Sequence, residues 1–149
     1  MFCIFNASAK PQGEHPEIGK FMGEMAQVRH KYEDVITKGS YIILPTNNPE
    51  ILAFARHKDG KTLLFIGNRN VNKAVGGTIQ IPGLKAEQRF ENLMPAYGEE
   101  CKFQNNKDGS ITVELGKSRA CIFEIDDRDI EKLSNPQSLG FSPVHRIFN

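Results

Sequence analysis

Short apolar runs separated by turn signals follow one another after Gly39, and this pattern most limits the folds open to the chain. The predicted strands are Tyr41–Leu44, Ile51–His57, Lys61–Asn68, Thr78–Ile81, Arg89–Met94, Lys102–Asn105, Ser110–Leu115 and Arg119–Ile125. Strands that are mostly joined by short turns predict an antiparallel sandwich or a Greek-key barrel. We take the fold as mainly β: an N-terminal amphipathic helix followed by an eight-stranded antiparallel Greek-key β-sandwich.

Two Asp-Gly pairs predict hairpin turns between these strands. Asp59-Gly60 and Asp108-Gly109 each lie between two predicted strands. Both residues of such a pair tolerate positive φ, which a tight hairpin turn requires. The strand after the second turn alternates between apolar and polar residues, so one face is expected to be buried. Its apolar positions are Ile111, Val113 and Leu115.

An amphipathic helix is predicted before the strands, with Pro16 at its first position, where proline is tolerated. Apolar residues recur there at steps of three and four. They form one stripe, which consists of Ile18, Phe21, Met22, Met25, Val28 and Tyr32. Gly19 and Gly23 cost the helix roughly 1 kcal/mol each and would let a neighbouring backbone approach closely. The stripe is expected to pack either on its own domain or against a partner domain.

The charge balance does not indicate a polyanionic partner. The 149 residues include 19 basic and 18 acidic ones, a net charge of +1. We therefore expect neither nucleic acid nor a membrane as a partner. No apolar run approaches the ~18 residues that cross a bilayer. The opening "MFCIFNASAK" lacks the basic start of a secretory signal, which leaves the compartment unknown.

Cysteine and histidine show no metal-binding spacing, so no metal and no cofactor are expected. The cysteines are Cys3, Cys101 and Cys121, and the histidines are His15, His30, His57 and His145. The cysteines are interpreted as reduced, mostly buried thiols, with a Cys101–Cys121 bridge as the alternative. The scattered histidines are expected at the surface.

Three segments carry a resemblance to a known family. "FMGEMAQVRHKYEDVITKGSYIIL" resembles the last helix of the catalytic barrel in the α-amylase family (glycoside hydrolase family 13), although "EDVI" departs from its usual "PAL" stretch. "ILAFARHKDGKTLLFIGNRN" is similar to the opening hairpin of that family's C-terminal all-β domain. "NKDGSITVELGKSRACIFEI" resembles the closing strands of that domain. The resemblance extends over residues 16–126. Its matching positions are Met25, Val28, Arg29, Tyr32, Val35, Ile36, Gly39, Ala53, Phe54, Arg56, Asp59, Gly60, Leu64 and Asn68.

The resemblance implies a catalytic barrel that precedes the β-domain and acts on α-glucosidic bonds with a nucleophilic Asp and a general-acid Glu. A (β/α)₈ barrel takes roughly 200 to 250 residues, and only 15 precede the predicted helix. The expected organisation is residues 1–39 as an N-terminal segment with the last barrel helix, 40–126 as the β-domain, and 127–149 as a short helix with an irregular tail. The chain is thus expected to be a truncated, non-catalytic piece of a longer protein.

No catalytic residue is predicted within the chain itself. Glycoside hydrolysis needs two facing carboxyl groups about 5 to 10 Å apart. Glu99 and Glu100 are adjacent and would diverge, and the cluster of Asp126, Asp127 and Asp129 follows a strand. Both sets are interpreted as solvated charges in turns.

Three functional hypotheses follow. The favoured one is a structural β-domain that covers a missing catalytic barrel, with interdomain contacts from Ile18, Phe21, Met22, Met25 and Arg29. Arg29 would pair with a carboxylate or backbone carbonyls of the barrel, or lie exposed. The same helix face would also suit a homodimer. The second hypothesis is a stand-alone carbohydrate-binding module for α-glucans, with Tyr97 as the aromatic platform in a chain without Trp. The third is a small enzyme with an unrecognised site.

Overall fold

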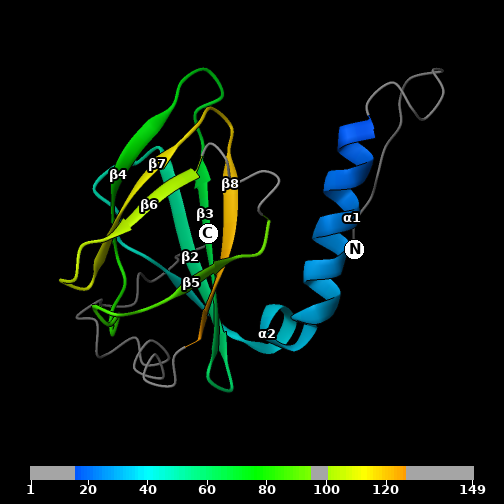
Figure 1. Cartoon of the computed structure of the whole chain (residues 1–149), viewed down its shortest axis with the longest axis horizontal. Helices are drawn as coiled ribbons and strands as arrows, with labels where there is room; N and C mark the ends of the chain where they lie inside the picture. Colours follow the sequence, from blue (N-terminus) through cyan, green and yellow to red (C-terminus); the bar gives the residue numbers. More distant parts are fainter. Residues whose placement is uncertain (1–15, 95–100, 127–149) are drawn as a thin grey trace, which may run out of the picture. The chain divides into compact units, whose positions relative to one another are not determined.

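The computed structural model describes residues 16–94 and 101–126, which form two helices and eight strands (Figure 1). The helices are α1 (Pro16–Lys31) and α2 (Glu33–Lys38). The strands are β1 (Ser40–Ile43), β2 (Ile51–Lys58), β3 (Lys61–Asn68), β4 (Val75–Gln80), β5 (Phe90–Asn92), β6 (Cys101–Asn105), β7 (Ser110–Leu115) and β8 (Ala120–Asp126). The expected short helix after residue 126 lies outside the described residues.

The strands form two antiparallel sheets that pack face to face (Figure 1). The five-stranded sheet has the order β1-β2-β3-β8-β5, and the three-stranded sheet has the order β4-β7-β6. The predicted mainly β fold with an N-terminal helix and two antiparallel sheets is therefore confirmed. The Greek-key connectivity stays a prediction.

The predicted hairpins are both present, but their turns differ. Asp59 and Gly60 have φ of 52° and 75°, as the tight turn between β2 and β3 requires. In the β6–β7 turn, positive φ falls instead on Lys107 and Gly109. Four residues make this turn, so the chain curls around Asp108, whose side chain accepts hydrogen bonds from Ser110.

The fourth strand begins earlier than predicted. Glycine weakens strands on propensity alone, which favoured a loop before Thr78. In the structure, β4 starts at Val75 because Gly76 and Gly77 pair with β7 along its whole length. Tertiary pairing therefore overrides the local preference of the two glycines.

The hydrophobic core lies between the two sheets. The predicted alternation in β7 is confirmed, since Ile111, Val113 and Leu115 are at most 1% exposed. The five-stranded sheet contributes its own alternate residues to this core. They include Ala53, Ala55, Leu64, Ile66, Cys121, Phe123 and Ile125.

The helical region consists of two helices, whereas the sequence predicted one helix with an apolar stripe that extends to Tyr32. The chain divides into two compact units, Met1–Lys31 and Tyr32–Asn149. Tyr32 has non-helical dihedral angles (φ −115°, ψ 25°) and separates α1 from α2. Tyr32 therefore belongs with the β-sheets and not with the apolar stripe of α1. Neither described helix has the length and apolar character of a membrane-crossing segment.

Candidate functional site

The outer face of the five-stranded sheet, which points away from the three-stranded sheet, is the candidate site. Strand alternation sends Ala53 and Ala55 into the core and Phe54 and Arg56 outward. Directly paired residues share a face, and Arg56 pairs with Tyr41 on β1. Residues of β1 and β2 therefore lie side by side on the outer face.

Part of this face exposes large apolar side chains, which we call the outer strip. The outer strip consists of Tyr41, Ile43, Leu52, Phe54 and Phe65. Tyr41, Ile43 and Leu52 are 54%, 63% and 45% exposed, and the two phenylalanines are half-buried. Exposed residues of this type on adjacent strands are typical of a surface that contacts another protein.

The aromatic rings of the outer strip pack against one another. The rings of Phe54 and Phe65 lie 4.7 Å apart and nearly parallel, and Tyr41 packs on Phe54 at 5.1 Å. The guanidinium of Arg56 lies 5.6 Å from the centre of the Tyr41 ring. Because the faces of these rings contact one another and Arg56, they offer little free π surface for a sugar ring.

Helix α2 covers the neighbouring part of the outer face. The Nε of Arg56 donates a hydrogen bond to the carbonyl of Ile36 in α2 at 3.0 Å, and its Nη2 donates to the same oxygen. The hydroxyl of Tyr32 donates to Glu124 on β8. These bonds hold α2 on the sheet beside the outer strip.

Helix α1 places its predicted contact residues along a largely exposed helix. Ile18 and Phe21 are 55% and 37% exposed. Met22, Met25 and Arg29 are half-buried. Apart from the adjoining residues and backbone of α1 itself, no described atom lies within 4 Å of where a Cβ would stand at Gly19 or Gly23. Contacts of these residues with another domain stay a prediction.

The described carboxyl groups with shifted pKa values are all shifted downward. A hydrogen bond and the charge of Lys38 lower the pKa of Asp34. A hydrogen bond from Asn70 lowers the pKa of Glu50. A general acid in glycoside hydrolysis needs a raised pKa instead. No group of three His, Cys, Asp or Glu residues that could hold a metal was found in the described ranges.

One histidine departs from its prediction. His57 was expected at the surface but is 6% exposed, with its Nδ1 2.8 Å from the hydroxyl of Thr62. His57 lies on the same buried face of β2 as Ala53 and Ala55. The alternation of the strand could therefore have predicted its burial. His30 is exposed, as predicted. Tyr97, Glu99 and Glu100 lie outside the described residues.

The exposed Tyr41 is the residue that sequence reasoning missed. The segment "YIIL" is apolar on both alternating faces, so its pattern does not reveal which face is exposed. Pairing with β2 decides the matter, because it places Tyr41 beside Arg56 on the outer face.

Comparison with solved structures identifies the fold. An α-amylase from Geobacillus thermoleovorans has a TM-score of 0.62 at 13% identity, covering 80% of this chain and 25% of that one. A maltogenic α-amylase from Thermotoga neapolitana has a TM-score of 0.59 at 18% identity, covering 83% and 29%. A debranching enzyme from Nostoc punctiforme has a TM-score of 0.55 at 16% identity, covering 75% and 21%. No protein-family model and no curated protein matches the sequence.

The chain therefore has a mainly β fold that forms part of α-amylase-family structures. It spans less than a third of the length of each of these three proteins. The resemblance predicted from the sequence is confirmed at the level of the fold.

Proposed function

We propose that the chain is the non-catalytic C-terminal β-domain of an α-amylase-like glycoside hydrolase and that it packs on and stabilises a catalytic barrel. The observation that carries this proposal is that the structural match covers most of this chain but only a small part of each α-amylase. It takes in 80% and 83% of this chain but only 25% and 29% of the two α-amylases. A (β/α)₈ barrel of roughly 200 to 250 residues would account for most of the unmatched length.

The outer strip supports a role in packing on another domain. Ile43 and Tyr41 are more than half exposed, and Leu52 on the same sheet face is 45% exposed. Removing such side chains from water yields roughly 25 cal/mol per Å² of apolar surface. The stripe of α1 supplies a second candidate surface through Ile18 and Phe21. We propose that both surfaces contact the barrel.

The carboxyl groups support a role without catalysis. Asp34 and Glu50 are held in their ionised form by Lys38 and Asn70. Glu124 accepts the hydrogen bond of Tyr32. Neither Asp34 nor Glu50 thus has the raised pKa of a general acid, so we assign the hydrolytic chemistry to the barrel.

The test has two stages. The coding DNA upstream of Met1 and in neighbouring genes is read for an α-amylase-type barrel, in the same reading frame or in its own. The full chain is then mixed with that barrel, and binding is measured by calorimetry. We expect a one-to-one complex and a higher melting temperature of the barrel within it.

Matched variants locate the contact. Ile43→Ser and Tyr41→Ser should each weaken the complex at least tenfold, because they remove apolar area from the outer strip. Val71→Ser is the control, since Val71 is 67% exposed but lies on the loop between β3 and β4. Absence of any barrel gene, or a complex that the strip variants leave unchanged, would contradict the proposal.

A stand-alone α-glucan-binding module is the second candidate. The observation that favours it is the exposed ring of Tyr41, which adds a described aromatic residue to the predicted Tyr97. The contacts of this ring with Arg56 and Phe54 make it the weaker candidate.

A further inference from the structure

Two cysteines from different sheets meet at one edge of the core. Cys121 on β8 is 2% exposed. Cys101, the first residue of β6, is half-buried and packs against the core cluster that contains Cys121. Neither residue forms a disulfide in this structure. Because β6 and β8 belong to different sheets, this pair joins the two layers of the sandwich.

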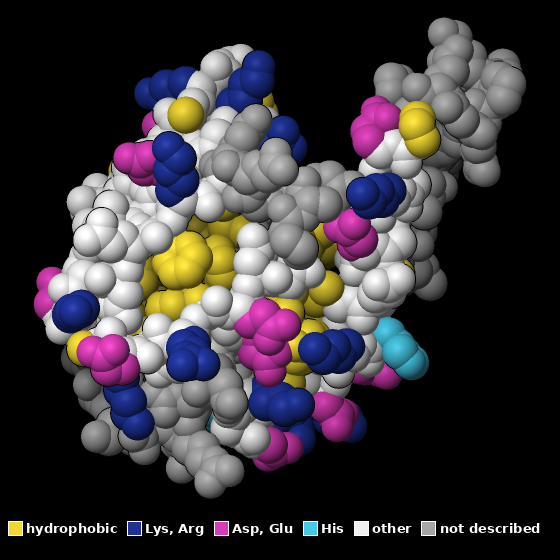
Figure 2. Space-filling model, viewed as in Figure 1, with side chains coloured by type: hydrophobic (Ala, Val, Ile, Leu, Met, Phe, Trp, Pro, Cys, Tyr) yellow, Lys and Arg dark blue, Asp and Glu magenta, His cyan; other side chains and the backbone are white. Residues whose placement is uncertain are grey.

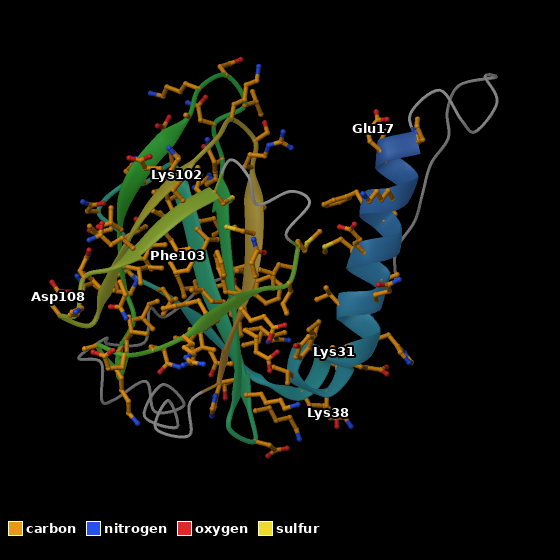
Figure 3. The ribbon with its side chains drawn as sticks, viewed as in Figure 1. Glu17, Lys31, Lys38, Lys102, Phe103 and Asp108 are labelled. Carbon is orange, nitrogen blue, oxygen red and sulfur yellow. The ribbon has the colours of Figure 1, made fainter. Side chains whose placement is uncertain are left out.

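The phenylalanines two residues further along each strand show how the strands align. The rings of Phe103 and Phe123 lie 4.7 Å apart in an edge-to-face arrangement. Figure 2 shows apolar side chains gathered on this face, where Figure 3 labels Phe103. Alternate residues of a strand share a face. Cys101 and Cys121 lie two residues before Phe103 and Phe123. They are therefore expected to face each other across the same contact between β6 and β8.

The chain connection between the sheets brings the cysteines together as well. Cys101 pairs with Leu115, the last residue of β7. After four intervening residues the chain has crossed to the other sheet and begins β8 at Ala120. A hydrogen bond that the Cys121 thiol donates to the sulfur of Cys101, together with burial, raises the pKa of Cys121 far above its usual range. The strand alignment and the packing of Cys101 on the core cluster thus place the two cysteine side chains close to each other.

We propose that Cys101 and Cys121 form a reversible disulfide that ties the two sheets together when a low-molecular-weight disulfide is present as the oxidant. The half-buried Cys101 is the accessible member and attacks a sulfur of the oxidant, which gives a mixed disulfide and one released thiol. Cys121 then attacks the sulfur of Cys101, and its proton passes to the departing thiolate. The protein loses two hydrogen atoms, and the oxidant becomes two thiols.

The disulfide would close a loop that contains the β6–β7 turn and the whole of β7. Such a cross-link limits the unfolded ensemble, so it stabilises the folded state. We expect the oxidised chain to melt roughly 5 to 10 °C higher than the reduced chain. This inference does not depend on the proposed packing against a barrel.

The experiment incubates the full chain, reduced and folded, with excess oxidised glutathione. The intact mass under non-reducing conditions should fall by two hydrogen atoms, and peptide mapping should recover a fragment that links Cys101 to Cys121. Dithiothreitol should restore the original mass and melting temperature. The Cys3→Ser variant is the matched control and should behave like the unmodified chain.

The variant Cys101→Ser removes the accessible thiol at a half-buried strand end and should abolish both the cross-link and the rise in melting temperature. Stable glutathione adducts on Cys101 without an internal bridge would overturn the proposal. So would a cross-linked fragment that contains Cys3, or a bridge that lowers the melting temperature.

Discussion

The hydroxyl of Tyr32 donates a hydrogen bond to the carboxylate of Glu124, 92 residues further along the chain. Tyr32 is 2% exposed and lies at the junction of α1 and α2. Glu124 lies on the outer face of β8, beside Leu63 on β3. This bond fixes the start of α2 on the sheet that carries the outer strip.

Replacing Tyr32 by Phe should therefore destabilise the sandwich. The change keeps the buried ring but leaves the half-buried Glu124 without this donor, which should cost about 1 kcal/mol. Urea denaturation measures the loss. Tyr41→Phe is the control, since Tyr41 is 54% exposed, and its midpoint should be unchanged. Equal midpoints for Tyr32→Phe and the unmodified chain would show that the bond adds nothing to stability.

Two adjacent glycines of β4 should respond differently to Ala. A Cβ at Gly77 would lie 2.7 Å from Oδ1 of Asn47, the atom that accepts a hydrogen bond from the backbone of Thr78. Gly77→Ala should cost about 1 to 3 kcal/mol, because the loop that carries Asn47 must move. At Gly76 the nearest atom is 3.5 Å away, so Gly76→Ala should be neutral or slightly stabilising. Thermal unfolding of both variants distinguishes these outcomes, and a similar loss at both positions would refute the steric explanation.

The Asp108 turn should make stability depend on acid pH. Hydrogen bonds from the side chain and the backbone N–H of Ser110 lower the pKa of Asp108 below its ordinary value of 3.8. A depressed folded-state pKa means that this contribution to stability is complete above about pH 4 and is lost as the pH falls through the depressed value. An NMR titration of the Asp108 carboxyl measures the pKa directly. Ser110→Ala should raise it toward 3.8, and an unchanged value would contradict the assigned cause.

The two tyrosine candidates for sugar binding can be separated by substitution. If the chain served as a carbohydrate-binding module, Tyr97→Ala or Tyr41→Ala should weaken maltooligosaccharide binding, since each removes an aromatic surface. Our structural proposal instead expects no heat of binding at millimolar maltoheptaose for the unmodified chain. Isothermal calorimetry decides between these outcomes. Measurable binding that Tyr97→Ala abolishes would favour the module.

The positions of the strands were readable from local patterns. Asp59-Gly60 has the positive φ values of a tight turn, and Ile111, Val113 and Leu115 are buried as their spacing indicates. These features depend on neighbours within a few residues. The start of β4 was misjudged because the cost of its glycines is a local effect, whereas its pairing with β7 is not.

The candidate surface was less accessible to sequence reasoning. The apolar stripe of α1 was visible from its spacing, but the exposure of Tyr41 and Ile43 follows from the register between β1 and β2. The separation of Tyr32 from that stripe depends on Glu124, which is distant in sequence. The spacing of apolar residues in a helix cannot predict a hydrogen bond to Glu124, which lies on β8.

The sequence by itself determined the strand series, the two hairpins and the mainly β class, because alternation and turn chemistry act over short distances along the chain. Only the tertiary structure decided that Cys101 meets Cys121, that His57 is buried, and which apolar residues remain exposed. These outcomes depend on how the two sheets pack and in which register their strands pair. The physical reason is that both are set by contacts between segments far apart in the sequence.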